Sequence, residues 1–255
     1  MITDIYNTVR QQLSYEFNCA PEDFLKDENV ITTPALHEKR RKFSEKPFFL
    51  QMATFGKNAV ISADERIHPW LKEWIKEKEG FWLFEQHNFY ELEKELRRYG
   101  YKMALTHHMF LPRPELMELK TDLKIKWLEQ EDIMAYYGRE EFSNALCDRF
   151  RPDRPDMLAI AALDGEEIMG MAGCSADSPE MWQIGIDVLP QYRGRGIAKI
   201  LVSMIRDEVF RRGALPYYGT SLSNLGSWKT ALGSGFSPAW VEAETREDKD
   251  ESFAK

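Results

Sequence analysis

Hydrophobic and polar residues alternate from Trp182 to Val188, the period of two that is typical of a β-strand. A proline and a turn with two glycines follow. Beyond the turn, one helical face gathers the apolar residues Ile197, Ile200, Leu201, Met204, Ile205 and Val209. Gly213 stands where a helix C-terminal cap is expected. The pattern predicts a strand, a glycine turn and an amphipathic helix. Unpaired backbone N–H groups at such a helix start favour binding of a phosphate group.

Further apolar runs surround this segment. Residues 157–163 and 168–175 are two strand candidates, and the Asp164-Gly165 pair between them is a hairpin signal. Downstream, residues 215–220 predict a short strand, and a second helix is expected to open at Asn224. These elements form the C-terminal half of the chain, which we delimit as residues 119–255.

Residues 1–118 predict a separate N-terminal α/β domain. Its first segment has helical periodicity, and the charged run that begins at His37 is interpreted as a solvated helix face. The proline pair in Leu111–Pro114 predicts a linker. Between them we expect strands at 48–54 and 59–63, a helix through Trp70 and Trp74, a strand at 81–84, a helix from Phe89 to Tyr99, and a strand through Met103 and Met109.

Composition narrows the class of protein. Hydrophobic residues make up 43% of the 255 positions, enough for two cores, while the net charge of −8 disfavours nucleic acid and anionic membranes as partners. The chain shows neither a leader pattern nor an apolar run of membrane-spanning length, so a cytoplasmic location is predicted. The cysteines, Cys19, Cys147 and Cys174, are interpreted as reduced thiols, and the histidines lack ligand spacing, so no metal is expected.

The glycine turn fits neither of two common nucleotide motifs. A P-loop requires Gly-Lys followed by Ser or Thr, and a dinucleotide fingerprint requires a third glycine where Lys199 stands. The pattern Gln/Arg-x-x-Gly-x-Gly/Ala fits instead, in the overlapping frames Gln191–Gly196 and Arg193–Ala198. The alternative interpretation is a glycine turn that precedes a core helix and binds nothing.

This pattern resembles the coenzyme A pyrophosphate loop of the GNAT superfamily of N-acetyltransferases. Asn224, Ser227 and Gly235-Phe236 match further family positions downstream. The resemblance implies a GNAT acyl-CoA N-acyltransferase fold from about Leu123 to Thr245. This is an α+β fold in three layers with a mixed, mostly antiparallel sheet. Because the N-terminal domain shows a similar order of elements, we take as a hypothesis that it is a degenerate GNAT-like half without the loop.

The resemblance also implies the function and the site. The expected activity is transfer of an acetyl group from acetyl-CoA to a primary amine of a small molecule or peptide, by direct attack in a ternary complex. Asn224 is implied near the pantetheine arm and Ser227 near the pyrophosphate. The Val188 amide is implied as a donor to the thioester carbonyl and is therefore counted as both catalytic and cofactor-binding. The implied pyrophosphate cradle comprises Arg193, Gly194, Arg195, Gly196, Ile197 and Ala198.

Two positions of the catalytic machinery have alternative interpretations. Glu180 stands 11 residues before Gln191, at the position of the glutamate base in histone-type members, but it could also be a solvated loop carboxylate, with Asp187 the next candidate. Ala231 occupies the position of the family's usual leaving-group tyrosine. Tyr217 or Tyr218 could substitute for it.

The missing tyrosine and the additional N-terminal half favour an alternative function, a non-catalytic acyl-CoA-binding sensor or interaction protein. A third interpretation is a transferase that uses another acyl group or an alcohol acceptor. Acceptor contacts are expected from residues 130–150, including Tyr136, Tyr137, Glu140, Glu141 and Phe142. A monomer or a homodimer is expected.

Overall fold

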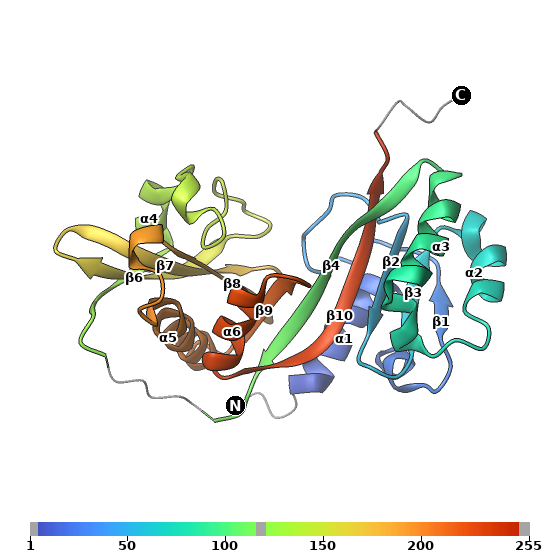
Figure 1. The fold of residues 1–255 in the computed structure, drawn as a ribbon, viewed down its shortest axis with the longest axis horizontal. Helices are drawn as coiled ribbons and strands as arrows, with labels where there is room; N and C mark the ends of the chain where they lie inside the picture. Colours follow the sequence, from blue (N-terminus) through green and yellow to red (C-terminus); the bar gives the residue numbers. More distant parts are fainter. Residues whose placement is uncertain (1–4, 116–120, 250–255) are drawn as a thin grey trace. The chain divides into compact units, whose positions relative to one another are not determined.

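The computed structural model describes residues 5–115 and 121–249. Within it the chain forms two compact units. Met109–Pro238 belong to unit 1, and Tyr6–His108 belong to unit 2 together with the chain from Ala239 onward. Strands β4 (Tyr101–Pro112) and β10 (Phe236–Glu247) therefore contribute residues to both units (Figure 1). The predicted domain boundary between residues 118 and 119 lies outside the described residues and stays a prediction.

The strands of unit 1 form a mixed, mostly antiparallel sheet. Antiparallel pairing joins, in order, β5 (Lys124–Glu129), β6 (Asp156–Asp164), β7 (Glu167–Ala176) and β8 (Met181–Val188). Strand β8 pairs in parallel with β9 (Leu215–Ser221). The helices are α4 (Gln130–Ile133), α5 (Ile197–Arg211) and α6 (Leu225–Gly233). The predicted fold class is confirmed, including the Asp164-Gly165 turn, where Gly165 has a φ of 61°.

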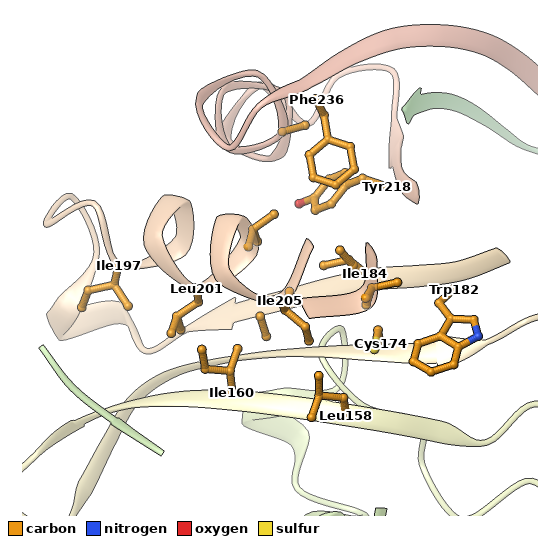
Figure 2. Packing of buried hydrophobic residues seen from close by; sticks show 14 of the residues in the cluster. Leu158, Ile160, Cys174, Trp182, Ile184, Ile197, Leu201, Ile205, Tyr218 and Phe236 are labelled. Carbon is orange, nitrogen blue, oxygen red and sulfur yellow. The ribbon is translucent and has the colours of Figure 1, made fainter. Parts of the chain in front are cut away.

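Side chains of α5 build the core on one face of this sheet. Figure 2 shows Leu201 and Ile205 between the helix and the strands that carry Leu158, Ile160 and Ile184, and all five side chains are buried. Burial of one such side chain stabilises the fold by about 1.5–3 kcal/mol. The opposite face of the sheet is covered by a second apolar cluster, which contains Leu128, Ile133, Phe142, Ala145, Leu146, Ala159, Ala161 and Met171.

Unit 2 has its own hydrophobic core. Its strand order is β1 (Val30–Thr32), β3 (Ala59–Ala63), β2 (Leu50–Thr54), β10 and β4, with only β1 and β3 recorded as a parallel pair among the described residues. Its helices are α1 (Ile5–Phe17), α2 (His68–Trp74) and α3 (Gln86–Arg97). The first residue of α1, Ile5, is assigned to unit 1. Unit 2 is thus an α/β unit, and the predicted division of the chain into two domains stays a prediction.

Three predictions in the N-terminal half are wrong. The charged run from His37 forms turns rather than a helix, and its member Arg41 is only 4% exposed because buried carboxylates pair with it. Residues Gly80–Phe84 form a 3-10 helix (η3), because the Gly80 backbone packs directly against the start of β3. Strand β4 continues to Pro112, inside the predicted linker. The hypothesis of a degenerate GNAT-like half stays a prediction.

Candidate active site

The glycine turn lies between β8 and α5. After the short 3-10 turn η6 (Pro190–Tyr192), Gly194 and Gly196 have φ values of 79° and 78°, and α5 begins at Ile197. L-residues with side chains rarely adopt this left-handed conformation, so glycine is required at both places. A Cβ atom added at either glycine would meet no atom within 4 Å. The outer side of the turn is therefore open.

The backbone amides of this turn are available for a ligand. The first hydrogen bond of α5 runs from Ile200 N to Gly196 O at 3.2 Å. Across the described parts of the chain, the N–H groups from Gly194 to Lys199 have no hydrogen-bond acceptor. Six consecutive N–H groups at the positive end of a 15-residue helix favour an anion such as a pyrophosphate.

Side chains hold the turn in place. Both carboxylate oxygens of Glu167, at the start of β7, are engaged: Tyr192 OH donates to one at 2.9 Å and Gln191 Nε2 to the other at 3.2 Å. Arg193 Nε donates to Val188 O at 3.0 Å. The predicted phosphate turn is therefore tied both to β7 and to the end of β8.

The two predicted arginines lie on the exposed side of the turn. The Arg195 guanidinium lies 5.2 Å from the centre of the Tyr192 ring, and its Nη2 donates to Gln191 O at 3.4 Å. Both Arg193 and Arg195 are exposed. Their charges are therefore positioned beside the unpaired amides, where they can attract an anion.

Strands β8 and β9 separate beside the turn. Their parallel pairing runs from Met181–Leu215 to Ile184–Tyr218, although both strands continue beyond these pairs. Backbone separation at this point leaves the last residues of β8 with a free edge on the β9 side.

Two amides of β8 point to this free edge. Leu189 N donates to Met169 O on the β7 side at 2.9 Å, and antiparallel ladders alternate, so the N–H groups of Ile186 and Val188 point away from β7. Neither has a strand partner on β9. The sequence singled out Val188, while Ile186 was missed although the alternation of the strand gives both residues the same orientation.

The start of α6 joins the site through Asn224 and Ser227. Asn224 Oδ1 accepts a hydrogen bond from Ser227 N at 3.1 Å and so caps the helix. Ser227 Oγ and Tyr218 OH lie 2.7 Å apart. Ala231 is buried one turn after Ser227, on the same face of α6. Burial raises the pKa of Tyr218, and the hydrogen bond with Ser227 opposes that rise.

The two candidate tyrosines lie on opposite faces of β9. Tyr217 OH donates to the buried carboxylate of Asp177, whereas Tyr218 faces α6. Successive strand residues point to opposite faces, which explains the difference. Tyr218 is therefore the tyrosine that lies at the level where β8 and β9 separate, on the side of Ala231.

Glu180 and Val188 are not brought together. Glu180 is exposed and immediately precedes β8, where its carbonyl oxygen accepts from Leu215 N at 2.7 Å in the paired part of the two strands. Eight residues of extended chain place it about 26 Å from Val188. The other candidate base, Asp187, is engaged by three hydrogen-bond donors.

The segment expected to contact the acceptor covers the sheet face opposite α5. Tyr136, Glu141 and Phe142 line a cavity of about 750 Å³ that extends to Leu189, the residue after Val188. Burial raises the pKa of Tyr137, and the nearby Asp156 carboxylate adds to the rise. Glu140 is exposed in the 3-10 turn η5 (Glu140–Phe142).

Two absences concern only the described residues. Within 5–115 and 121–249, no three His, Cys, Asp or Glu side chains are arranged to hold a metal ion. The helices of the same ranges are all too short or too polar to cross a membrane. The expectations of no metal and of a cytoplasmic location remain expectations.

Comparison with known proteins gives a family match for part of the chain. The sequence model of the acetyltransferase (GNAT) family matches residues 122–236. Curated protein sequences yield no match. The match covers a little less than half of the 255-residue chain.

The solved structures that match parts of this chain include the following three. A GNAT-family protein from Novosphingobium aromaticivorans is 18% identical, with a TM-score of 0.44. The match covers 57% of this chain and 66% of the Novosphingobium protein, which is just under two thirds of its length. A GCN5-related N-acetyltransferase-like protein from Streptococcus suis is 19% identical, with a TM-score of 0.44 over 64% and 69%. A protein from Salmonella typhimurium, solved with acetyl-CoA as its cofactor, is 13% identical, with a TM-score of 0.36 over 52% and 97%.

The model of the acetyltransferase (GNAT) family therefore matches the part of unit 1 that contains the glycine turn.

Proposed function

We propose that the chain is an acetyl-CoA-dependent N-acetyltransferase that acts on a primary amine of a small molecule or peptide. One observation carries this proposal: the six unpaired amides from Gly194 to Lys199 lie beside the place where β8 separates from β9. An anion-binding helix start next to a free strand edge suits a long thin substrate that has a phosphate at one end and a carbonyl group at the other.

Each group of this chain has a defined task in the proposal. The amides from Gly194 to Ala198 bind the pyrophosphate of acetyl-CoA, whereas the Arg193 amide already donates to Pro190 O at 3.3 Å. Asn224 and Ser227 shape the wall formed by α6. The Val188 N–H donates to the thioester carbonyl, where negative charge develops when the amine attacks. One such preorganised donor contributes about 10²–10³-fold to a rate.

Collapse of the tetrahedral intermediate breaks the carbon–sulfur bond and releases coenzyme A. A free thiol has a pKa of roughly 8.5, so the thiolate can leave without a strong acid. Tyr218 is the candidate donor of a proton to the sulfur, because its hydroxyl lies against Ser227 on the α6 side of the strand gap. This replaces the tyrosine that the family has at the position of Ala231.

The role of Glu180 as the base stays a prediction. A lysine-like amine has a pKa of about 10.4, so its neutralisation at pH 7 costs roughly 4–5 kcal/mol, and a base or a water relay is useful. If Glu180 is the base, Glu180→Gln lowers turnover by roughly 10²–10⁴-fold with unchanged acetyl-CoA affinity. Full activity of the Glu180→Gln variant from pH 6 to 9 would instead indicate that water or Asp187 is the base, or that the amine is already neutral.

Turnover measurements test the proposed function. We expect coenzyme A release, followed by thiol detection, to rise above the hydrolytic background with at least one member of a panel of small amines and lysine-containing peptides. Tight acetyl-CoA binding with no turnover across the panel would favour the acyl-CoA sensor, which the buried Ala231 supports. Faster reaction with a longer acyl chain or with an alcohol would contradict acetyl transfer to an amine.

A further inference from the structure

The carboxylate of Asp187 binds the chain segment that lies under the end of β8. Asp187 Oδ2 accepts from Asn144 N at 2.8 Å and from Ala145 N at 2.9 Å, and Oδ1 accepts from Asn144 Nδ2 at 2.7 Å. Hydrogen bonds to an ionised carboxylate are roughly twice as strong as neutral ones. All three donors belong to the segment directly after η5, so one side chain of β8 holds this segment.

Two glycines let the segment approach the sheet. Gly173 on β7 and Gly185 on β8 are direct cross-strand partners. A Cβ atom at Gly185 would lie 1.8 Å from Asn144 O, and one at Gly173 would lie 2.2 Å from Ala145 O. Glycine weakens a strand interior, and a close approach of another backbone is the usual reason for its presence there. The Asn144–Ala145 backbone therefore lies directly on the sheet.

The Asp187 side chain is attached directly beside the peptide group that joins Asp187 to Val188 and carries the Val188 N–H. In this peptide the Asp187 carbonyl points toward β7 and the Val188 N–H points to the free edge. On the following peptide, Arg193 Nε binds Val188 O at 3.0 Å. The stretch Asp187–Val188 is thus fixed by β7, by the segment beneath it and by the phosphate turn, although β9 does not pair with it.

We propose that Asp187 is a positioning residue, whose clamp on Asn144 and Ala145 sets the plane of the Asp187–Val188 peptide and thereby the direction of the Val188 N–H. Without the clamp, the backbone of this strand edge would be held by β7 on one side and by Arg193 alone on the other. This inference rests on the proposed function, because it requires the thioester carbonyl to bind at Val188. It also gives Asp187 a task other than that of a base, since its oxygens are engaged by donors.

The carbonyl ¹³C resonance of bound [1-¹³C]acetyl-CoA reports the clamp directly. A hydrogen bond polarises the carbonyl and moves its resonance downfield from that of free acetyl-CoA. We expect such a displacement with the wild type, a displacement reduced by about half with Asp187→Asn, and almost none with Asp187→Ala. The asparagine retains one oxygen acceptor but loses the charge. Calorimetry should show the acetyl-CoA affinity of all three proteins within a few-fold, because the pyrophosphate site is untouched.

The matched control is Asp164→Asn, which makes the same chemical change at an exposed residue at the end of β6 and should leave the resonance at its wild-type position. An unchanged displacement in Asp187→Asn, with acetyl-CoA bound, would overturn the positioning role. Failure of the wild type to bind acetyl-CoA would instead contradict the proposed function. Since Asp187→Asn is nearly isosteric, its folded state can be verified by circular dichroism, and the inference does not depend on the alanine variant.

Discussion

Replacing Gly196 with glutamate is expected to remove acetyl-CoA binding, with a loss of at least about 100-fold in affinity by calorimetry. The new carboxylate would stand among the unpaired amides, where the pyrophosphate is proposed to bind, and would repel it. No atom lies within 4 Å of the added Cβ position, so the fold has room for the side chain. The remaining cost is the left-handed backbone, roughly 1–2 kcal/mol.

Gly213→Glu is the matched control for this experiment. Gly213 follows the other end of α5, has a φ of 84°, and likewise has no atom within 4 Å of an added Cβ. The control adds the same charge and the same backbone strain to the same helix, far from the phosphate turn. We expect it to bind acetyl-CoA like the wild type. Unchanged affinity in a folded Gly196→Glu protein would show that the site is misplaced.

Glu244→Gln is expected to raise the free energy of unfolding by about 3 kcal/mol at pH 8 and to leave it unchanged near pH 4. Glu244 lies on β10 beside a buried ionic cluster in unit 2. In that cluster Arg41 pairs with Glu16 at 2.7 Å and with Glu242 at 2.9 Å. The Arg41 guanidinium therefore already forms ion pairs with two other carboxylates beside Glu244.

Burial and the neighbouring Glu242 raise the pKa of Glu244 from 4.5 to about 7. For Glu242 itself burial also opposes ionisation, but Arg41 and the Trp240 indole N–H hold its pKa below the ordinary value. A carboxyl whose pKa is higher in the folded state stabilises the fold fully below the unfolded pKa. That contribution is lost as the pH rises from 4.5 through 7, because the folded state then has to ionise a buried group.

The expected change in the free energy of unfolding follows from the raised pKa of Glu244, since each pKa unit corresponds to about 1.4 kcal/mol. Urea unfolding of the wild type and of Glu244→Gln at pH 4, 6 and 8 measures this difference in the free energy of unfolding. The control is Glu247→Gln, an exposed carboxyl on the same strand, which should change stability little at any of these pH values. A difference between Glu244→Gln and the wild type that does not grow with pH would contradict the assignment.

The sequence by itself determined the elements that rest on local signals. The strand, glycine turn and helix around Gly194 and Gly196 were predictable because periodicity and glycine conformation depend on neighbours a few residues away. The cap at Asn224 is of the same kind, since its partner is only three residues along the chain. The resemblance to the GNAT family rests on the same kind of signal, as its motif is a short local arrangement.

The tertiary structure alone decided the features that depend on distant partners. The charged run appeared solvated, but Arg41 is buried because Glu16 and Glu242, 25 and 201 residues away, neutralise it. Gly80–Phe84 became a 3-10 helix because the Gly80 backbone packs against the Asn58 and Ala59 backbone at the start of β3.

Within the site, the separation of β8 from β9 was not readable from either strand, because both have ordinary strand patterns over their full lengths. The separation of Glu180 from Val188 follows once β8 is known to be an unbroken strand from Met181 to Val188. The task of Asp187 could not be assigned from alternation, which places its side chain on one face of the strand without naming what covers that face. Asn144 and Ala145 lie more than 40 residues earlier, and only folding brings their amides to its carboxylate.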